Sequence, residues 1–120
     1  MFQSRFAAAV ERREKRQTIR PLGKPHYRPP HAGDELSLRT WSGKAYRSPQ
    51  RKLREPVTCT AVRPVFIGLY RDRLNIRIND QVVPDADAFA RADGFTCVLE
   101  MREWFEATHG LPFVGRLIEW

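Results

Sequence analysis

The stretch KRQTIR, residues 15–20, decides how this chain is interpreted, because a helix is predicted to end and a strand to begin there. Upstream, apolar residues recur at helical spacing and predict a helix over residues 2–14. Downstream, residues 17–20 include β-branched side chains and stop at Pro21, which is typical of a short strand. The junction places an ammonium, a hydroxyl and a guanidinium at positions i, i+3 and i+5. That combination is a candidate site for a small polar or anionic ligand.

A purely structural interpretation of Lys15 is also open. The predicted helix ends in a basic run made of Arg12, Arg13, Lys15 and Arg16. Cations near a helix C-terminus are stabilised by the negative end of the helix dipole. On this interpretation the run completes the helix and binds nothing.

Length and composition indicate a single domain over residues 1–120. Hydrophobic residues make up 42% of the chain, which suffices for a core without disulfide bonds. Cys59 and Cys97 are far apart in sequence and are expected to be reduced thiols. No stretch approaches the roughly 20 apolar residues of a membrane span, and the charged N-terminus lacks an apolar signal core. We therefore expect a soluble, cytoplasmic protein that does not bind membranes.

The positive charge is concentrated in the first half of the chain. Residues 1–63 hold 15 Lys and Arg against 5 Asp and Glu, whereas residues 64–120 hold 6 against 9. A half with a net charge of +10 attracts polyanions, so a nucleic acid or nucleotide is a reasonable partner. The alternative is a solvated basic surface that only keeps the protein in solution.

Two long segments are predicted to be loops. Residues 21–34 contain four prolines and two glycines, which exclude regular structure. They also carry charged, aromatic and titratable groups, so they are either a ligand-covering loop or a mobile surface loop. His26 and His31 have no Cys or carboxylate cluster at ligand spacing, and no metal or other cofactor is expected. The basic residues 42–55 are either solvated or in contact with phosphates.

The remaining pattern is rich in strands. Residues 35–41 alternate as a single strand, and residues 56–70 predict a β region with a bulge or bend at Pro64. Residues 74–83 predict a hairpin, with Asn79-Asp80 at its turn. A helix capped by Asp85 or Asp87, a second helix ending at Gly110 and a strand over 113–120 complete the chain. This order favours an α+β fold built on a mixed β-barrel flanked by short helices.

With these landmarks placed, the chain resembles the ASCH domain family of the PUA-like superfamily, whose members are small β-barrels. The resemblance covers almost the whole chain, and it rests on the order and spacing of its pieces. These pieces are the helix from Phe6 into KRQTIR, Gly33-Asp34-x-Leu36, the strand Cys59 to Val62, Ala92-Asp93-Gly94-Phe95, Trp104-Phe105 and the final Trp120.

Bacterial ASCH proteins include amidohydrolases that remove the acyl group from N4-acetylcytidine. The resemblance implies that Lys15, Thr18 and Asp93 are catalytic. A threonine hydroxyl needs a base to take its proton, and a lysine can be that base only if its pKa falls from about 10.4. The acid would orient the lysine or serve the leaving amine.

The chain departs from the amidohydrolase pattern at two positions. Arg16 stands where the family signature has a threonine, and Asp93 stands where the amidohydrolases have glutamate. Because aspartate is one methylene shorter, its carboxylate would shift by about 1 Å, and misplacement on that scale costs about 100-fold in rate.

Three functions are therefore considered. The first is binding of RNA or a modified nucleoside in a basic pocket, with hydrolysis by an amidohydrolase or ribonuclease reaction. The second is a non-catalytic RNA-binding module that stacks bases on Tyr27, Trp41 and Tyr46. The third is a structural or regulatory protein with a vestigial pocket. The predicted ligand-binding residues are Arg16, Arg20, Lys24, Tyr27 and Arg28.

Overall fold

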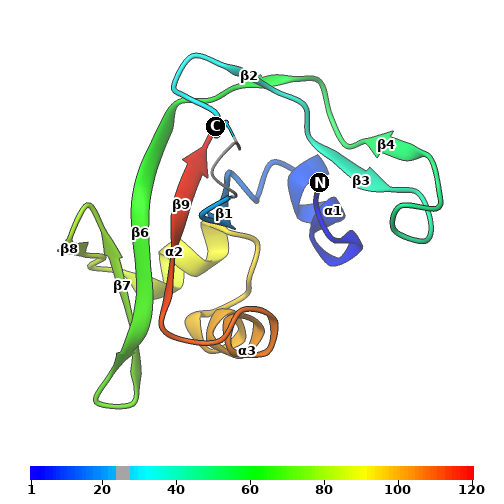
Figure 1. The fold of residues 1–120 in the computed structure, drawn as a ribbon. Helices are drawn as coiled ribbons and strands as arrows, with labels where there is room; N and C mark the ends of the chain where they lie inside the picture. The colour runs from blue at the N-terminus through cyan, green and yellow to red at the C-terminus, as the bar shows by residue number, and fades with distance from the viewer. Residues whose placement is uncertain (24–27) are drawn as a thin grey trace.

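Five antiparallel strands form the central sheet of the computed structural model, which describes residues 1–23 and 28–120. Their order across the sheet is β1-β9-β6-β7-β8, and β6 and β9 lie side by side at its centre (Figure 1). The bounds are Gln17–Pro21 for β1, Ala61–Tyr70 for β6, Arg73–Ile78 for β7, Gln81–Val82 for β8 and Phe113–Glu119 for β9.

In the described residues, three short helices accompany the sheet: α1 (Ser4–Glu11), α2 (Ala86–Ala92) and α3 (Val98–Thr108). The predicted cap of α2 is confirmed, because the Asp85 carboxylate accepts a hydrogen bond of 3.0 Å from the Ala88 amide. The residues of α1 occupy a shorter span than the predicted 2–14, since Arg13 adopts a left-handed φ of 65° and ends the helix.

Two small ribbons of the described part of the chain lie outside the sheet. One pairs β2 (Glu35–Leu36) with β5 (Val57–Thr58), and the other pairs β3 (Arg39–Trp41) with β4 (Gln50–Lys52). We call residues 39–52 the arm, because this ribbon extends away from the sheet beyond α1 (Figure 1). An isolated bridge between Phe2 and Thr40 and an ion pair between Glu11 and Arg51 hold the arm to the N-terminal region.

The α+β class is confirmed, but the strand pairs of residues 1–23 and 28–120 do not close a barrel. The outermost strands of the sheet, β1 and β8, each pair with one neighbour. The ribbon strands are two or three residues long, and all three residues of β4 are exposed. Strands this short bury too little apolar surface to be held against the sheet and complete a cylinder.

Of the bulge or bend predicted at Pro64, the bulge is wrong, since β6 runs through this residue in unbroken register with β9. Pro64 pairs with Arg116, while the pairing of β6 with β7 begins only at Val65 and Ile78. The Pro64 carbonyl accepts from Asn79 in the turn after β7. Pro64 has no amide hydrogen, but it lies opposite the turn that follows β7, so no hydrogen bond between β6 and β7 is lost.

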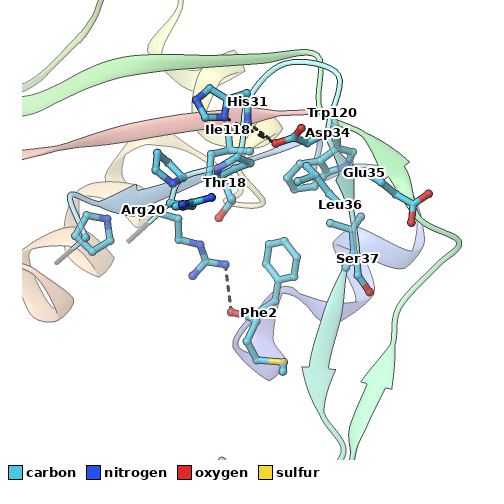
Figure 2. A pocket seen from close by; sticks show the side chains of 17 residues that line it. Phe2, Thr18, Arg20, His31, Asp34, Glu35, Leu36, Ser37, Ile118 and Trp120 are labelled. Carbon is cyan, nitrogen blue, oxygen red and sulfur yellow. Dashed lines mark hydrogen bonds and ion pairs between the residues drawn. The ribbon is translucent and has the colours of Figure 1, made fainter. Parts of the chain in front are cut away.

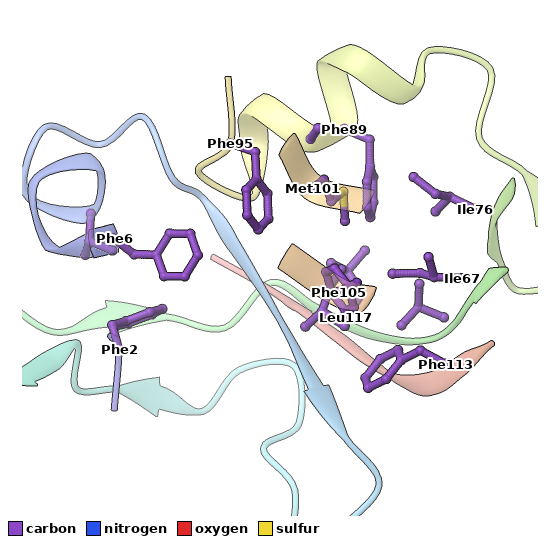
Figure 3. Packing of buried hydrophobic residues seen from close by; sticks show 14 of the residues in the cluster. Phe2, Phe6, Ile67, Ile76, Phe89, Phe95, Met101, Phe105, Phe113 and Leu117 are labelled. Atoms are coloured by element: carbon purple, nitrogen blue, oxygen red, sulfur yellow. The ribbon is translucent and has the colours of Figure 1, made fainter. Parts of the chain in front are cut away.

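The hydrophobic core lies between the sheet and the pair α2–α3 (Figure 3). Met101 and Phe105 of α3 are fully buried and face Ile67 and Leu117 of the central strands. An aromatic series continues the core toward α1: Phe6 contacts Phe95 and Trp104, with ring centroids 5.3 and 5.7 Å apart. Within the described part of the chain, no helix is long and apolar enough to cross a membrane.

Candidate functional site

The end of α1 turns the chain so that Lys15 enters the protein. Arg13 and Glu14 donate backbone hydrogen bonds to Val10 and Ala9, which is the pattern of a Schellman motif. The next turn is fixed by the Arg16 amide, which donates to the Ala92 carbonyl at the end of α2 over 2.9 Å. Lys15 is thus held between the two helix ends, immediately before β1.

The end of α2 repeats the same motif and presents Asp93. Phe95 donates to Ala90 and Gly94 donates to Arg91, with Gly94 at a φ of 99°. A Cβ at Gly94 would lie 3.0 Å from Lys15 Cδ and 3.1 Å from a ring carbon of Phe6. Glycine is therefore required here both by the backbone conformation and by the packing of the Lys15 stem.

Lys15 and Asp93 form a buried ion pair. Their exposed fractions are 2% and 4%. Lys15 Nζ donates to the Asp93 backbone carbonyl and lies 3.3 Å from Asp93 Oδ1. The ammonium also faces the rings of Phe6 and Phe2, whose centroids lie 4.9 and 5.7 Å away. The lysine is thus positioned by groups from the N-terminal residues, from α1 and from the end of α2.

Burial shifts both members of this pair toward their neutral forms. Desolvation raises the pKa of Asp93 to about 6, although Lys15, Arg20 and Gln17 act in the opposite direction. Desolvation lowers the pKa of Lys15, which Asp93 partly restores and Arg20 lowers further. Gln17 acts on Asp93 at longer range, since its buried Nε2 makes no hydrogen bond of ordinary geometry to any described residue. A lysine that loses its proton more easily is a better candidate base.

A small cavity joins the three predicted catalytic residues. It measures about 130 Å³, and we call it the inner cavity. Lys15, Thr18 and Asp93 all line it, together with Arg20 of β1. Thr18 is half-buried, and its hydroxyl makes no hydrogen bond to the described residues. The volume accommodates a few water molecules or a group of acetyl size.

A larger hollow of about 1110 Å³, which we call the outer cleft, adjoins the inner cavity (Figure 2). Phe2, Thr18, Arg20 and Pro21 line both spaces, so the two are neighbours along β1. The outer cleft also collects polar and aromatic groups from other segments, which include Arg28, His31, Asp34 and Trp120.

Arg20 places a positive charge where the two spaces meet. Its Nη2 donates to the Met1 carbonyl over 3.1 Å, and its guanidinium carbon lies 5.4 Å from the centroid of the Phe2 ring. Its positive charge contributes to lowering the pKa of Lys15 and that of His109, for which desolvation is the larger cause. An anionic or electron-rich ligand group would be attracted to this point.

Five of the eight predicted site residues lie around these two spaces. Lys15, Thr18, Asp93 and Arg20 line the inner cavity, and Arg28 lines the outer cleft. Arg16 is exposed and lines neither of them. Lys24 and Tyr27 lie outside the described residues, as does His26.

Sequence reasoning missed two side chains at the site. His109 lines the inner cavity from the end of α3, and its ring lies 4.8 Å from that of Phe113. Trp120 lines the outer cleft, and its Nε1 is buried without a hydrogen-bond partner among the described residues. Trp120 was noted only as part of the family pattern, and the position of His109 beside the helix-ending Gly110 was the only local signal.

No group of three or more His, Cys, Asp or Glu side chains is placed to hold a metal ion in residues 1–23 and 28–120. Comparison with protein-family models, curated proteins and solved structures gave no match.

Proposed function

We propose that the protein binds a modified nucleoside, free or within RNA, and hydrolyses the amide of an acylated cytosine, as its resemblance to ASCH domains implies. We also propose that the chain is a member of the PUA-like superfamily. The observation that carries it is the inner cavity, where Lys15, Thr18 and Asp93 meet and where burial lowers the pKa of Lys15. These residues are separated by up to 78 positions in the sequence, so their convergence depends on the fold.

Each residue has a definite role in this reaction. The neutral Lys15 amine takes the proton of the Thr18 hydroxyl while Thr18 Oγ1 forms a bond to the acyl carbon. The bond from that carbon to the cytosine N4 breaks, and Lys15 returns the proton to the departing N4. Water then hydrolyses the threonine ester, which releases the carboxylic acid and restores the hydroxyl. Asp93 holds the lysine by its carbonyl and carboxylate oxygens.

The resting geometry requires a small rearrangement before this reaction. Lys15 Nζ donates to Asp93, and no hydrogen bond joins it to Thr18 Oγ1. Catalytic hydrogen bonds are often long or absent without substrate and form in the complex. Rotation of the Lys15 terminus within the inner cavity would turn the lone pair of the neutral amine toward Thr18, whose hydroxyl would then donate to it.

The outer cleft supports a nucleoside as the substrate class. Its volume of about 1110 Å³ exceeds what an acyl group needs, and it matches the upper range of small-molecule pockets. Phe2 and Trp120 supply aromatic surface, while Arg20 and Arg28 supply positive charge. A base and ribose in the outer cleft would direct an acyl group toward Thr18 and the inner cavity.

The direct test replaces Thr18 by valine, which keeps the shape of the side chain and removes the nucleophile. Thr18→Val is expected to lower the turnover of N4-acetylcytidine by at least about 1000-fold, measured by the absorbance change on deacylation. Thr58→Val, at an exposed position of β5, is the matched control and keeps wild-type turnover. Wild-type protein without turnover of any N4-acylcytidine would refute the amidohydrolase.

A second candidate function, RNA binding without catalysis, is favoured by the arm. Trp41 and Tyr46 place their ring centroids 5.2 Å apart, and Tyr46 is 88% exposed. The same segment carries five cations: Arg39, Lys44, Arg47, Arg51 and Lys52. Exposed aromatic rings among cations are the usual platform for unpaired bases.

Tyr46→Ala tests this candidate. Loss of one stacked base is expected to raise the Kd for a single-stranded oligoribonucleotide about fivefold or more, measured by fluorescence anisotropy. Tyr70→Ala removes a tyrosine that is 63% exposed and lies beside Arg71, so it controls for general loss of aromatic surface. Equal effects of the two variants would exclude a specific role for the arm.

A further inference from the structure

Four arginines surround a hollow that belongs to neither of the two spaces described above. Arg12 and Arg13 come from the end of α1, Arg16 from the connection to β1 and Arg91 from the last turn of α2. The hollow measures about 830 Å³, and we call it the arginine hollow. Among the described residues, it shares no lining residue with the inner cavity or the outer cleft.

The positive charge of the arginine hollow is only partly compensated. Arg12 pairs with Glu14 through contacts of 3.0 and 3.2 Å, and Glu14 is the acidic residue in the lining. Arg13, Arg16 and Arg91 form no ion pair with any described residue. Grouping like charges around one concave surface is unfavourable unless an anion neutralises them.

The backbone at Arg13 bears on whether the helix end itself calls for an arginine. Helices α1 and α2 end in the same Schellman motif, and the left-handed position is Gly94 in α2 but Arg13 in α1, with φ values of 99° and 65°. Glycine is the preferred residue at this position, and an L-residue there is strained. Arg71 and several turn residues share a left-handed φ, so the conformation alone assigns no role to Arg13. It does show that glycine would fit this helix end at least as well as arginine.

Stabilisation of helix ends does not explain the whole cluster. The dipole of α2 favours Arg91 in its last turn. Arg16 lies outside both helices, and glycine would serve the α1 terminus better than Arg13. A binding role accounts for these two residues together with Arg91.

We propose that the arginine hollow binds a run of consecutive phosphate groups. Planar guanidinium groups match phosphate oxygens in pairs, and donors from three separate segments fit several phosphates better than one. Such a run occurs in the backbone of a single-stranded nucleic acid and in a free oligophosphate. This inference does not depend on the proposed hydrolysis, because Lys15, Thr18 and Asp93 do not line the hollow.

The test compares two triple variants with the same net charge. The hollow variant is Arg13→Gly/Arg16→Gln/Arg91→Gln. The control is Arg71→Gly/Arg73→Gln/Arg77→Gln, which removes three arginines that line a separate surface hollow beside β7. Arg71 also has a left-handed φ, of 50°, so each variant contains one glycine at a compatible position. The probes are a fluorescein-labelled oligouridylate and inorganic tripolyphosphate.

The hollow variant is expected to bind the oligouridylate at least tenfold more weakly than the wild type at about 50 mM salt. The slope of the logarithm of its binding constant against the logarithm of salt concentration should be shallower by about 2. Each lost phosphate contact removes about 0.7 from this slope, and three contacts are lost. The control should change the affinity less than about threefold. Competition by tripolyphosphate would show that a free oligophosphate suffices, and absence of competition would assign the site to the nucleic-acid backbone.

If both triple variants lost the same affinity for oligouridylate, the loss would be due to net charge alone, and the proposal would be overturned. Wild-type protein that binds neither probe would also overturn it. Melting temperatures of both triple variants establish that they are folded. The Arg13→Gly single variant repeats the binding test with one charge removed, and it is expected to melt no lower than the wild type.

Discussion

Lys15 and Asp93 show how two buried charges are tolerated at a single point. Each is more than nine-tenths buried, and each supplies the other's counter-ion. Removing one partner leaves an uncompensated charge, which typically costs about 3–5 kcal/mol. Lys15→Ala therefore confounds catalysis with stability. Thr18 has no such partner among the described residues, so Thr18→Val is the cleaner variant.

The raised pKa of Asp93 predicts a specific dependence of stability on pH. An unfolded aspartate has a pKa of 3.8, whereas that of Asp93 is about 6. Between these values the folded protein binds more protons than the unfolded chain, so the free energy of unfolding decreases as the pH rises. A pKa difference of about 2 corresponds to roughly 3 kcal/mol. Urea denaturation between about pH 4 and pH 7 measures this decline.

Asp93→Asn removes the carboxyl and should abolish the decline, whereas Asp80→Asn, in an exposed turn, should retain it. His109 acts in the opposite sense, because its lowered pKa makes the folded state bind fewer protons. Comparison of the two variants isolates the contribution of Asp93. A decline of the same size in Asp93→Asn would assign the effect to another group.

At the scale of the element, the ends of α1 and α2 determine where the site lies. The two Schellman motifs direct Lys15 and Asp93 toward one another, and the hydrogen bond from Arg16 to Ala92 holds the helix ends together. The left-handed position of this motif is Gly94 in α2, which packs against Lys15, and Arg13 in α1, which lines the arginine hollow.

Substitutions at the two left-handed positions are expected to have opposite effects. Arg13→Gly relieves a left-handed φ and should raise the free energy of unfolding by up to about 1 kcal/mol, after the greater flexibility of unfolded glycine is subtracted. Gly94→Ala introduces the same strain and presses a Cβ against Lys15 and Phe6, so it should cost about 2–4 kcal/mol. Urea midpoints measure both. Equal midpoints for Gly94→Ala and the wild type would contradict the tight packing described here.

At the scale of the whole molecule, the sheet and the arm differ in how firmly they are held. Strands β6 and β9 carry Val65, Ile67, Phe113 and Leu117 into the core. All residues of β4 in the arm are exposed, and ribbon pairs of this length are marginal alone. Hydrogen exchange should therefore be slowest at the paired amides of β6 and β9 and orders of magnitude faster in β4. Similar protection in β4 and β9 would show that the arm is held by contacts beyond those described.

Local signals predicted much of this architecture. The α+β class, the hairpin of β7 and β8, the Asp85 cap and strand β9 each follow from turn residues, capping residues or short apolar runs. The break between β2 and β3 and the strand β4 were missed, because ribbons of two or three residues depend on their partners more than on their own sequence. Barrel closure depends on contacts distant in the sequence, which periodicity does not encode.

The candidate site could be predicted only in part. The meeting of Lys15, Thr18 and Asp93 in one cavity was expected from a family pattern, since no local rule joins residues 78 positions apart. Arg16, which follows Lys15 in the KRQTIR stretch, is predicted to bind ligand but lines neither the inner cavity nor the outer cleft. Successive side chains of extended backbone point to opposite sides, which places Lys15 inside and Arg16 outside.

Because β1 pairs with β9, the central sheet cannot be completed until β9 has been synthesised. Thr18 lies opposite Ile118, so the strand that carries it has no partner in the central sheet until residues 113–119 leave the ribosome. At about 5–20 residues per second, the wait lasts roughly 5–20 s. During that interval Phe6, Val10 and Ile19, which are buried in the finished protein, have no sheet to cover them. The N-terminal segment is therefore expected to expose apolar side chains that the completed sheet later covers.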